Sequence, residues 1–207
     1  MMLSNDIICR AVILLAFFSP WLLTASAERI EFCDSIPDSF AGWNSNVSLP
    51  KFDPEMGTLR EVVLSCEMNL SQELNIENEN SEASNYTLIL SGALTVDLPS
   101  SENLTISFNH STQGNLFAYD GTSDFSGPSG NKSVTDIPTE AATRSISGIN
   151  DFLAESPGES IVLPVTVQVS SRTKASGTSS SGVLSRAGAK VCVSYSYDPK
   201  SEEGGRQ

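Results

Sequence analysis

The chain has 207 residues, of which 39% are apolar and 18% are charged, and its 12 Lys and Arg against 25 Asp and Glu give a formal charge of −13. This apolar share excludes an intrinsically disordered chain and permits a modest hydrophobic core in one or two domains. The acidic balance argues against nucleic acid as a partner, because affinity for phosphate backbones comes from clustered Lys and Arg.

The N-terminal segment, residues 1–27, has the pattern of a cleavable signal peptide. Arg10 precedes a nearly unbroken apolar run over residues 11–23, and Ala25-Ser26-Ala27 fits the small-x-small rule for cleavage. A transmembrane anchor is the alternative, but this run is shorter than the roughly 20 residues that a spanning helix needs. We therefore expect an exported mature chain that begins at Glu28 and contains no membrane span.

Export would place the cysteines of the mature chain in an oxidising environment, where a disulfide is expected. Cys9 would leave with the signal peptide, and Cys33, Cys66 and Cys192 are too far apart for a short metal-ligand motif. Three cysteines permit one bridge, and their spacing does not choose among the three possible pairs. The alternative is that all three are small buried residues in strands. Cys66 shares the apolar parity of its strand, whereas Cys192 has the opposite parity.

The mature chain also contains Asn-x-Ser/Thr sequons, which receive sugar where the host has a suitable transferase and the site is exposed. We expect these sites to add bulky, solubilising sugar if they are used. The six candidate asparagines are Asn46, Asn69, Asn85, Asn103, Asn109 and Asn131.

Alternation of apolar and polar residues predicts β-strands along most of the mature chain. Gly92 predicts a bulge in one of them, and Pro164 predicts a strand that lies at an edge or is broken by a bulge. A short helical turn is expected within residues 146–153. The alternating rows occupy residues 62–70, 86–98, 161–169 and 189–197, with shorter candidates at 74–77 and 104–108.

The connections between these rows are rich in turn-forming residues. Glycine, proline and asparagine cluster between Tyr119 and Lys132, and Ser170–Gly188 has the composition of a long flexible Ser/Gly loop before the last strand. Short antiparallel strands joined by turns imply two sheets packed face to face. We expect one all-β domain over residues 28–199, an antiparallel β-sandwich of jelly-roll type, followed by a short polar tail at residues 200–207.

Two motifs make the chain similar to a known family. LPKFDPEMGTL at residues 49–59 leads into the first long row, and YDGTSDFSGPSG occupies residues 119–130. Together with the Val- and Tyr-rich closing strand they resemble the choice-of-anchor E domain over residues 32–197. The resemblance implies an exported or surface-exposed, all-β prokaryotic domain with no enzymatic activity and no established ligand. Since only polar residues follow Pro199, we expect free secretion or retention through other envelope components.

Each motif also has a local physical interpretation. In the first motif, two prolines enforce extended or turn geometry and Phe52 supplies an apolar anchor. In the second, Asp120 and Asp124 offer oxygens of the kind that calcium prefers, but the spacing of a calcium loop and its closing glutamate are missing. We therefore expect these carboxylates to bracket a turn through backbone hydrogen bonds, with no metal or other cofactor.

Catalytic chemistry finds little support in the sequence. His110 is the single histidine, and its polar surroundings predict a solvated loop or strand end and not a general base. No motif singles out a pair of carboxylates for glycoside hydrolysis, so a hydrolase is the least favoured class. We expect a non-catalytic secreted or cell-surface protein that serves a structural or interaction role among envelope or matrix components. The alternative is an extracellular ligand-binding module, for carbohydrate or dependent on calcium, although Trp43 and most tyrosines are expected to be buried.

Overall fold

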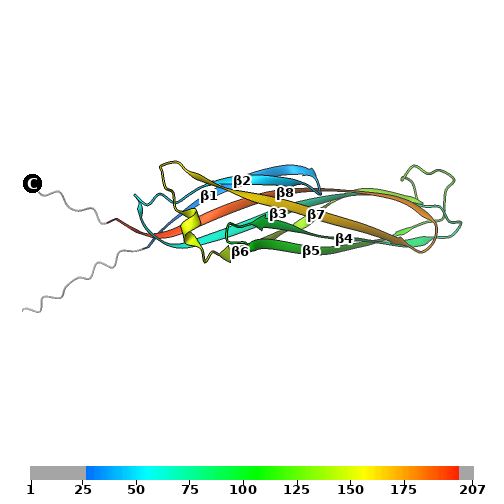
Figure 1. Ribbon diagram of the computed structural model, residues 1–207. Helices are drawn as coiled ribbons and strands as arrows, with labels where there is room; N and C mark the ends of the chain where they lie inside the picture. Colours follow the sequence, from blue (N-terminus) through cyan, green and yellow to red (C-terminus); the bar gives the residue numbers. More distant parts are fainter. Residues whose placement is uncertain (1–26, 201–207) are drawn as a thin grey trace, which may run out of the picture.

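The computed structural model describes residues 27–200, which form two four-stranded antiparallel sheets packed face to face (Figure 1). Almost all of the expected signal peptide, with Cys9, and nearly all of the expected polar tail lie outside the described residues. The strands are β1 (Glu28–Phe40), β2 (Asn44–Pro50), β3 (Gly57–Asn78), β4 (Ser84–Asp97), β5 (Asn103–Leu116), β6 (Gly130–Ser145), β7 (Ser160–Ala175) and β8 (Ser179–Pro199). A single 3-10 turn, η1 (Ile149–Phe152), falls in the segment where a helical turn was predicted.

The connectivity is that of one long hairpin rolled into a sandwich. β4 pairs with β5, β3 with β6, β2 with β7 and β1 with β8, all antiparallel. Rolling brings β8 against β3 and β7 against β4, which produces the sheet orders β1-β8-β3-β6 and β2-β7-β4-β5. Eight strands in two such sheets define a jelly roll, and the predicted fold class is confirmed.

The hydrophobic core follows the alternation of the strands. Along β3, every second residue from Val62 to Ile76 points between the sheets, and this series contributes to two separate clusters. The larger cluster fills most of the sandwich, and a smaller cluster around Leu74 and Tyr86 fills its far end. Between them lies Gln72, which is only 3% exposed and whose Oε1 has no hydrogen-bond partner. Along β3, a single buried polar side chain therefore separates the two apolar clusters.

The near end of the sandwich, where β1 begins and β8 ends, is closed by the segment between β2 and β3 (Figure 1). Phe52 is fully buried, and its ring centroid lies 5.7 Å from that of Tyr195 and 5.1 Å from that of Tyr197. The Tyr195 hydroxyl donates to the Pro50 carbonyl at 2.8 Å. The predicted anchoring role of Phe52 is confirmed.

The predicted Ser/Gly loop over Ser170–Gly188 is wrong. β7 continues to Ala175, β8 starts at Ser179, and the turn between them is short. β4 pairs with β7 up to Ala175, and β3 pairs with β8 from Ser179 onward. The ladder uses backbone N–H and C=O groups that every one of these small residues possesses, so a segment poor in apolar side chains still forms two strands.

Gly92 does not mark a bulge, because it stays in register opposite Phe108 on one side and Val169 on the other. A Cβ atom at this position would clash with the Gln168 carbonyl oxygen and lie 2.8 Å from the Phe108 ring. Glycine is therefore required by close packing between neighbouring strands.

Pro164 lies in a strand that is interior to its sheet, so the expectation of an edge strand is wrong, and the β2–β7 ladder passes through it without a register shift. Val167 donates its N–H to Trp43 on the β2 side at 3.0 Å, so even-numbered residues of β7 face β4. The β4 ladder ends at Val165. Pro164 lies beyond the end of that ladder, so no β4 carbonyl is left without a donor by the missing N–H of the proline.

Replacing Gly92 with alanine should lower the free energy of unfolding by about 1–3 kcal/mol, because the added methyl group overpacks the contact with β7 and Phe108. Urea unfolding measures the change. Gly182→Ala is the matched control, since a Cβ at Gly182 meets no atom within 4 Å. Equal stability of the two variants would contradict the packing role of Gly92.

Candidate functional site

The one disulfide in the described residues joins the first strand to the last. Cys33 and Cys192 lie directly opposite each other in the β1–β8 ladder and are bonded. Cys66 points into the core from β3 and is a free, buried thiol, and burial raises its pKa to about 12. The predicted disulfide is confirmed, and the register selects its pair.

Residues 27–200 of the native protein should therefore present no reactive thiol at pH 8, because Cys66 is inaccessible and this pH is far below the pKa of its thiol. A thiol-specific chromogenic reagent should react with Cys66 only after the protein is unfolded. Cys33→Ser with Cys192→Ser should lower the free energy of unfolding by about 2–5 kcal/mol. Rapid labelling of the folded protein, or unchanged stability of the double variant, would contradict this assignment.

The loop between β5 and β6, at the far end of the sandwich, contains both aspartates considered for calcium. The Asp120 Oδ1 accepts the Thr122 N–H at 3.0 Å, and the Asp124 Oδ1 accepts the N–H and hydroxyl of Ser126 at 2.9 and 2.7 Å. These hydrogen bonds hold the pKa of Asp124 below its usual value. Both carboxylates shape local turns.

Glu77, which the sequence analysis did not single out as a site residue, binds the backbone of the same loop. It is fully buried at the end of β3, its Oε2 accepts the Phe125 N–H at 2.7 Å, and its Oε1 has no partner. Among residues 27–200, no group of three or more His, Cys, Asp or Glu side chains is arranged to hold a metal. The calcium hypothesis thus gains no ligand set from this part of the chain.

His110 lies in the middle of β5, on the inward parity of Leu104, Ile106 and Phe108, and is half-buried. The prediction of a solvated loop or strand end is therefore wrong. The cause is that β5 continues well past its apolar half, held by its ladder with β4. Within the described range no hydrogen bond joins His110 to a carboxylate.

The sequon asparagines all lie on strands. Five of them are exposed, whereas Asn131 is half-buried and its amide nitrogen donates to the Tyr86 hydroxyl at 2.7 Å. Asn131 is thus the least accessible candidate for sugar. The exposed five are Asn46, Asn69, Asn85, Asn103 and Asn109.

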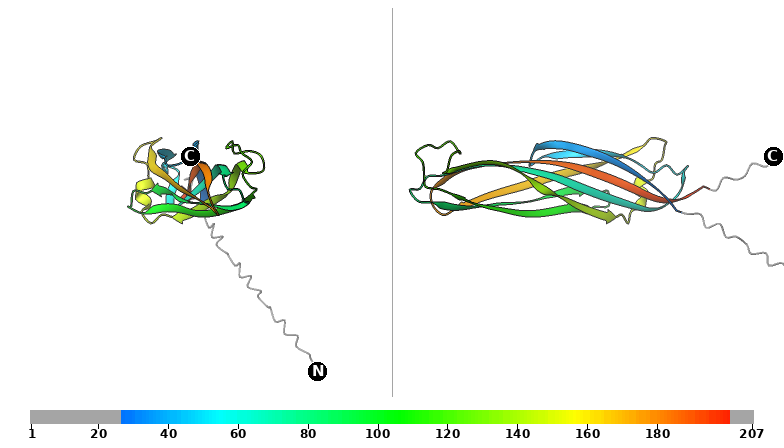
Figure 2. Two further views of the ribbon diagram at one scale, coloured as in Figure 1. Left: turned by 90° about the vertical axis from the view of Figure 1, so that its right-hand side faces the viewer. Right: turned by 180° about the vertical axis from the view of Figure 1, so that it is seen from behind.

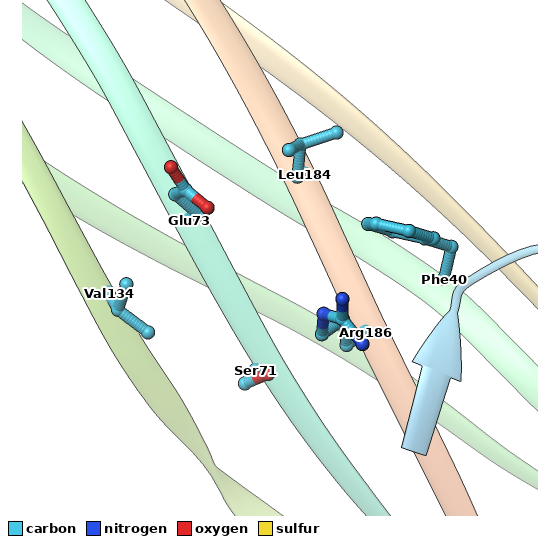
Figure 3. A pocket seen from close by; sticks show the side chains of 6 residues that line it. All are labelled: Phe40, Ser71, Glu73, Val134, Leu184 and Arg186. Carbon is cyan, nitrogen blue, oxygen red and sulfur yellow. The ribbon is translucent and has the colours of Figure 1, made fainter.

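A cluster of exposed side chains lies on the outer face of the sheet that contains β8 (Figure 3). Phe40, Val134 and Leu184 are 58%, 70% and 50% exposed, and they surround a depression of about 200 Å³. The Arg186 guanidinium lies 4.3 Å from the centroid of the Phe40 ring. We call these four residues, with Ser71 and Glu73, the outer-face patch.

The register of the sheet assembles this patch. Glu73 of β3 lies opposite Leu184 of β8 on one side and Val134 of β6 on the other. Two residues earlier in β3, Ser71 lies opposite Arg186 of β8. Phe40 ends β1 opposite Arg186. Sequence reasoning missed the patch because Ser170–Gly188 was taken for a loop. The alternation of the last strand could have predicted it. If the inward positions are continued from Ala189 back through Ala187 and Ser185, Arg186 and Leu184 fall on the outward face.

A second hollow, of about 310 Å³, adjoins the patch and shares Phe40 and Leu184 with it. It lies between the edges of the two sheets, beyond the ends of β1 and β2. We call it the edge groove. Its other lining residues are Ala41, Val169, Ser171, Val183 and Ser185.

Fold and site together define a jelly-roll β-sandwich with a cross-strand disulfide and an exposed patch. No family model matches the chain, and no curated protein matches it. Its described residues include no helix with the length and apolarity to cross a membrane.

Solved structures that match the chain include capsid proteins of infectious bursal disease virus. One is the D431N mutant VP2 protein in T=1 particles, at 10% identity and a TM-score of 0.16, with 86% of this chain and 42% of that chain covered. Another structure of T=1 particles has 10% identity and a TM-score of 0.16, with 83% and 41% covered. The chain spans about two fifths of these proteins, and similarity at this level supports no conclusion about function.

Proposed function

We propose that this protein is a non-catalytic, exported component of the cell surface or extracellular matrix, of the choice-of-anchor E type, which binds other envelope or matrix components. The observation that carries the proposal is the gathering of Phe40, Val134 and Leu184 on one outer face, each at least half exposed. Exposed apolar side chains that cluster and are rimmed by polar groups are typical of interaction sites.

Export is supported by the Cys33–Cys192 bond, since such disulfides persist in oxidising compartments outside the cytosol. The exposure of five sequon asparagines also suits a secreted chain that carries sugar. The proposed family assignment rests on the two sequence motifs, of which residues 49–59 run from the end of β2 to the start of β3 and residues 119–130 run from the β5–β6 loop to the start of β6.

Fractionation of the native cells tests this proposal. We expect the protein in the envelope or matrix fraction. Its intact mass should equal that of a chain that begins at Glu28, less two hydrogens for the disulfide. Leu184→Ser should move most of the protein into the medium, because it removes apolar contact area from the patch.

The matched control is Val162→Ser, since Val162 is 60% exposed on another strand, away from the patch. Equal retention of the two variants would contradict a role for the outer-face patch. Cytoplasmic protein that still carries residues 1–27 would contradict export itself.

An alternative function is carbohydrate binding at the far end of the sandwich. The specific observation is that Phe117 and Tyr119 are 70% and 37% exposed at the start of the β5–β6 loop, whereas Tyr86, Tyr195 and Tyr197 are buried as predicted. Exposed aromatic rings serve as platforms for sugar rings.

This alternative predicts that the purified protein binds a subset of glycans on an array and that Phe117→Ala removes the signal while Phe40→Ala preserves it. Addition of EDTA distinguishes a calcium-dependent form from an independent one. An array without signal would eliminate the alternative and leave the first proposal in place.

A further inference from the structure

β7 and β8 each have one unpaired edge in the far half of the sandwich. β1 ends at Phe40 opposite Arg186, and β2 starts at Asn44 opposite Thr166. Figures 1 and 2 show these blue strands stopping part-way along the molecule, while β7 and β8 continue to the far end. No described strand pairs with the outer edge of residues 168–175 of β7 or of residues 179–184 of β8.

The last hydrogen bonds at each edge identify the backbone groups that are free. Val167 N–H donates to Trp43 at 3.0 Å, and the Ser185 carbonyl accepts the Ala41 N–H at 2.9 Å. Because alternate residues of an antiparallel strand face the same neighbour, the N–H and C=O groups of Val169, Ser171 and Thr173 face outward from β7. An open row of this kind is a template for an added strand.

Two of the usual protections of an edge strand are missing from this part of β7. Residues 168–175 include no proline, and their ladder with β4 runs without a register shift. Bulges and prolines block any added strand, whereas charged side chains, which this edge does carry, discourage only strands of like charge. The edge groove beside it, with Phe40, Val169 and Val183 in its wall, offers apolar seats for alternate side chains of an incoming strand.

Charge selects the kind of strand that fits. The segment 160–197 contains no Asp or Glu, although the whole chain has a formal charge of −13. Arg172 and Lys174 lie on the open edge of β7, and both are exposed. Pairing of this edge with the same edge of a second copy would bring these like charges together, whereas an acidic strand would neutralise them.

We propose that the open edge of β7, residues 168–175, accepts an extended acidic segment of a partner polypeptide as an added strand, with apolar side chains of that segment in the edge groove. This inference rests on the proposed interaction function and specifies its mode, which is backbone pairing for affinity with alternate side chains for specificity.

The test uses an acetylated octapeptide of alternating glutamate and valine, with binding to the purified protein followed by fluorescence anisotropy at low salt. Ser171→Pro removes an outward N–H and leaves the β4 ladder intact, and it should weaken binding about tenfold or more. Ser171→Ala keeps the N–H and should bind as the unmodified protein does. Arg172→Glu with Lys174→Glu should weaken binding similarly, whereas Lys132→Glu with Lys190→Glu, an exposed pair elsewhere, should not.

A peptide with N-methylated valines supplies a measurement that does not depend on the folding of any variant. It keeps the charge and loses the N–H groups, and it should fail to bind. Two results would overturn strand addition: equal binding of the methylated peptide, or peptide binding that is weakened by the charge-reversal variant and unchanged by Ser171→Pro. Either would indicate general attraction of an anionic chain, such as an acidic polysaccharide.

Two further outcomes would also overturn the inference. The first is no binding of the octapeptide at millimolar concentration. The second is a dimer in sedimentation that Ser171→Pro dissociates, which would make a second copy the occupant. The proposed function is judged separately, by whether Leu184→Ser releases the protein from the envelope, so that failure of one proposal is distinguishable from failure of the other.

Discussion

The pairing of β3 with β8 is the constraint on which the rest of the molecule depends. The ladder extends from Gly57 opposite Pro199 to Asn78 opposite Ser179, with a single register shift near Leu59. A slip of one residue would turn all side chains of one of these strands to the opposite face relative to the other. If β3 turned over, Val62 and Cys66 would leave the core, and if β8 turned over, Cys192 would face away from Cys33. The two-residue period along both strands therefore fixes the core, the disulfide and the outer face together.

Unequal strand lengths then determine where the molecule is open. β3 and β8 have 22 and 21 residues, whereas β1 has 13 and β2 has 7. Each sheet consequently lacks one strand over its far half, so the core there is the smaller cluster around Leu74. Gln72, with its unpartnered Oε1, lies in register with Ser185 at the boundary. The edge groove lies where these strands are missing.

The sequence predicted those features that depend on parity or on a local anchor. The strand rows, the two-sheet architecture and the burial of Phe52 follow from alternation and from prolines that restrict the backbone. The choice of Cys33 and Cys192 as partners required the register of strands that are 159 residues apart in sequence. Parity nevertheless contained part of the answer, because Cys66 faces the core and Cys192 faces outward.

Two of the wrong predictions share one physical cause, which is that a β-ladder is held by backbone groups that composition does not report. Ser170–Gly188 and the polar half of β5 around His110 were read from their side chains, yet both pair continuously with a neighbouring strand. The outer-face patch was missed for the same reason. Its residues become neighbours only when β1, β3, β6 and β8 are placed side by side.

The net charge conceals an uneven distribution that follows the sheet order. β7 and β8 contribute Arg172, Lys174, Arg186 and Lys190 without an acid between Ser160 and Tyr197, while most acids lie on β1, β3 and β6 and in the loops. An open edge normally invites pairing with an identical edge. Here the same edge carries Arg172 and Lys174, so two copies that approach through it repel each other, while their acidic remainder adds to that repulsion. The edge is thus disfavoured for self-association by the same charges that make it complementary to an acidic strand.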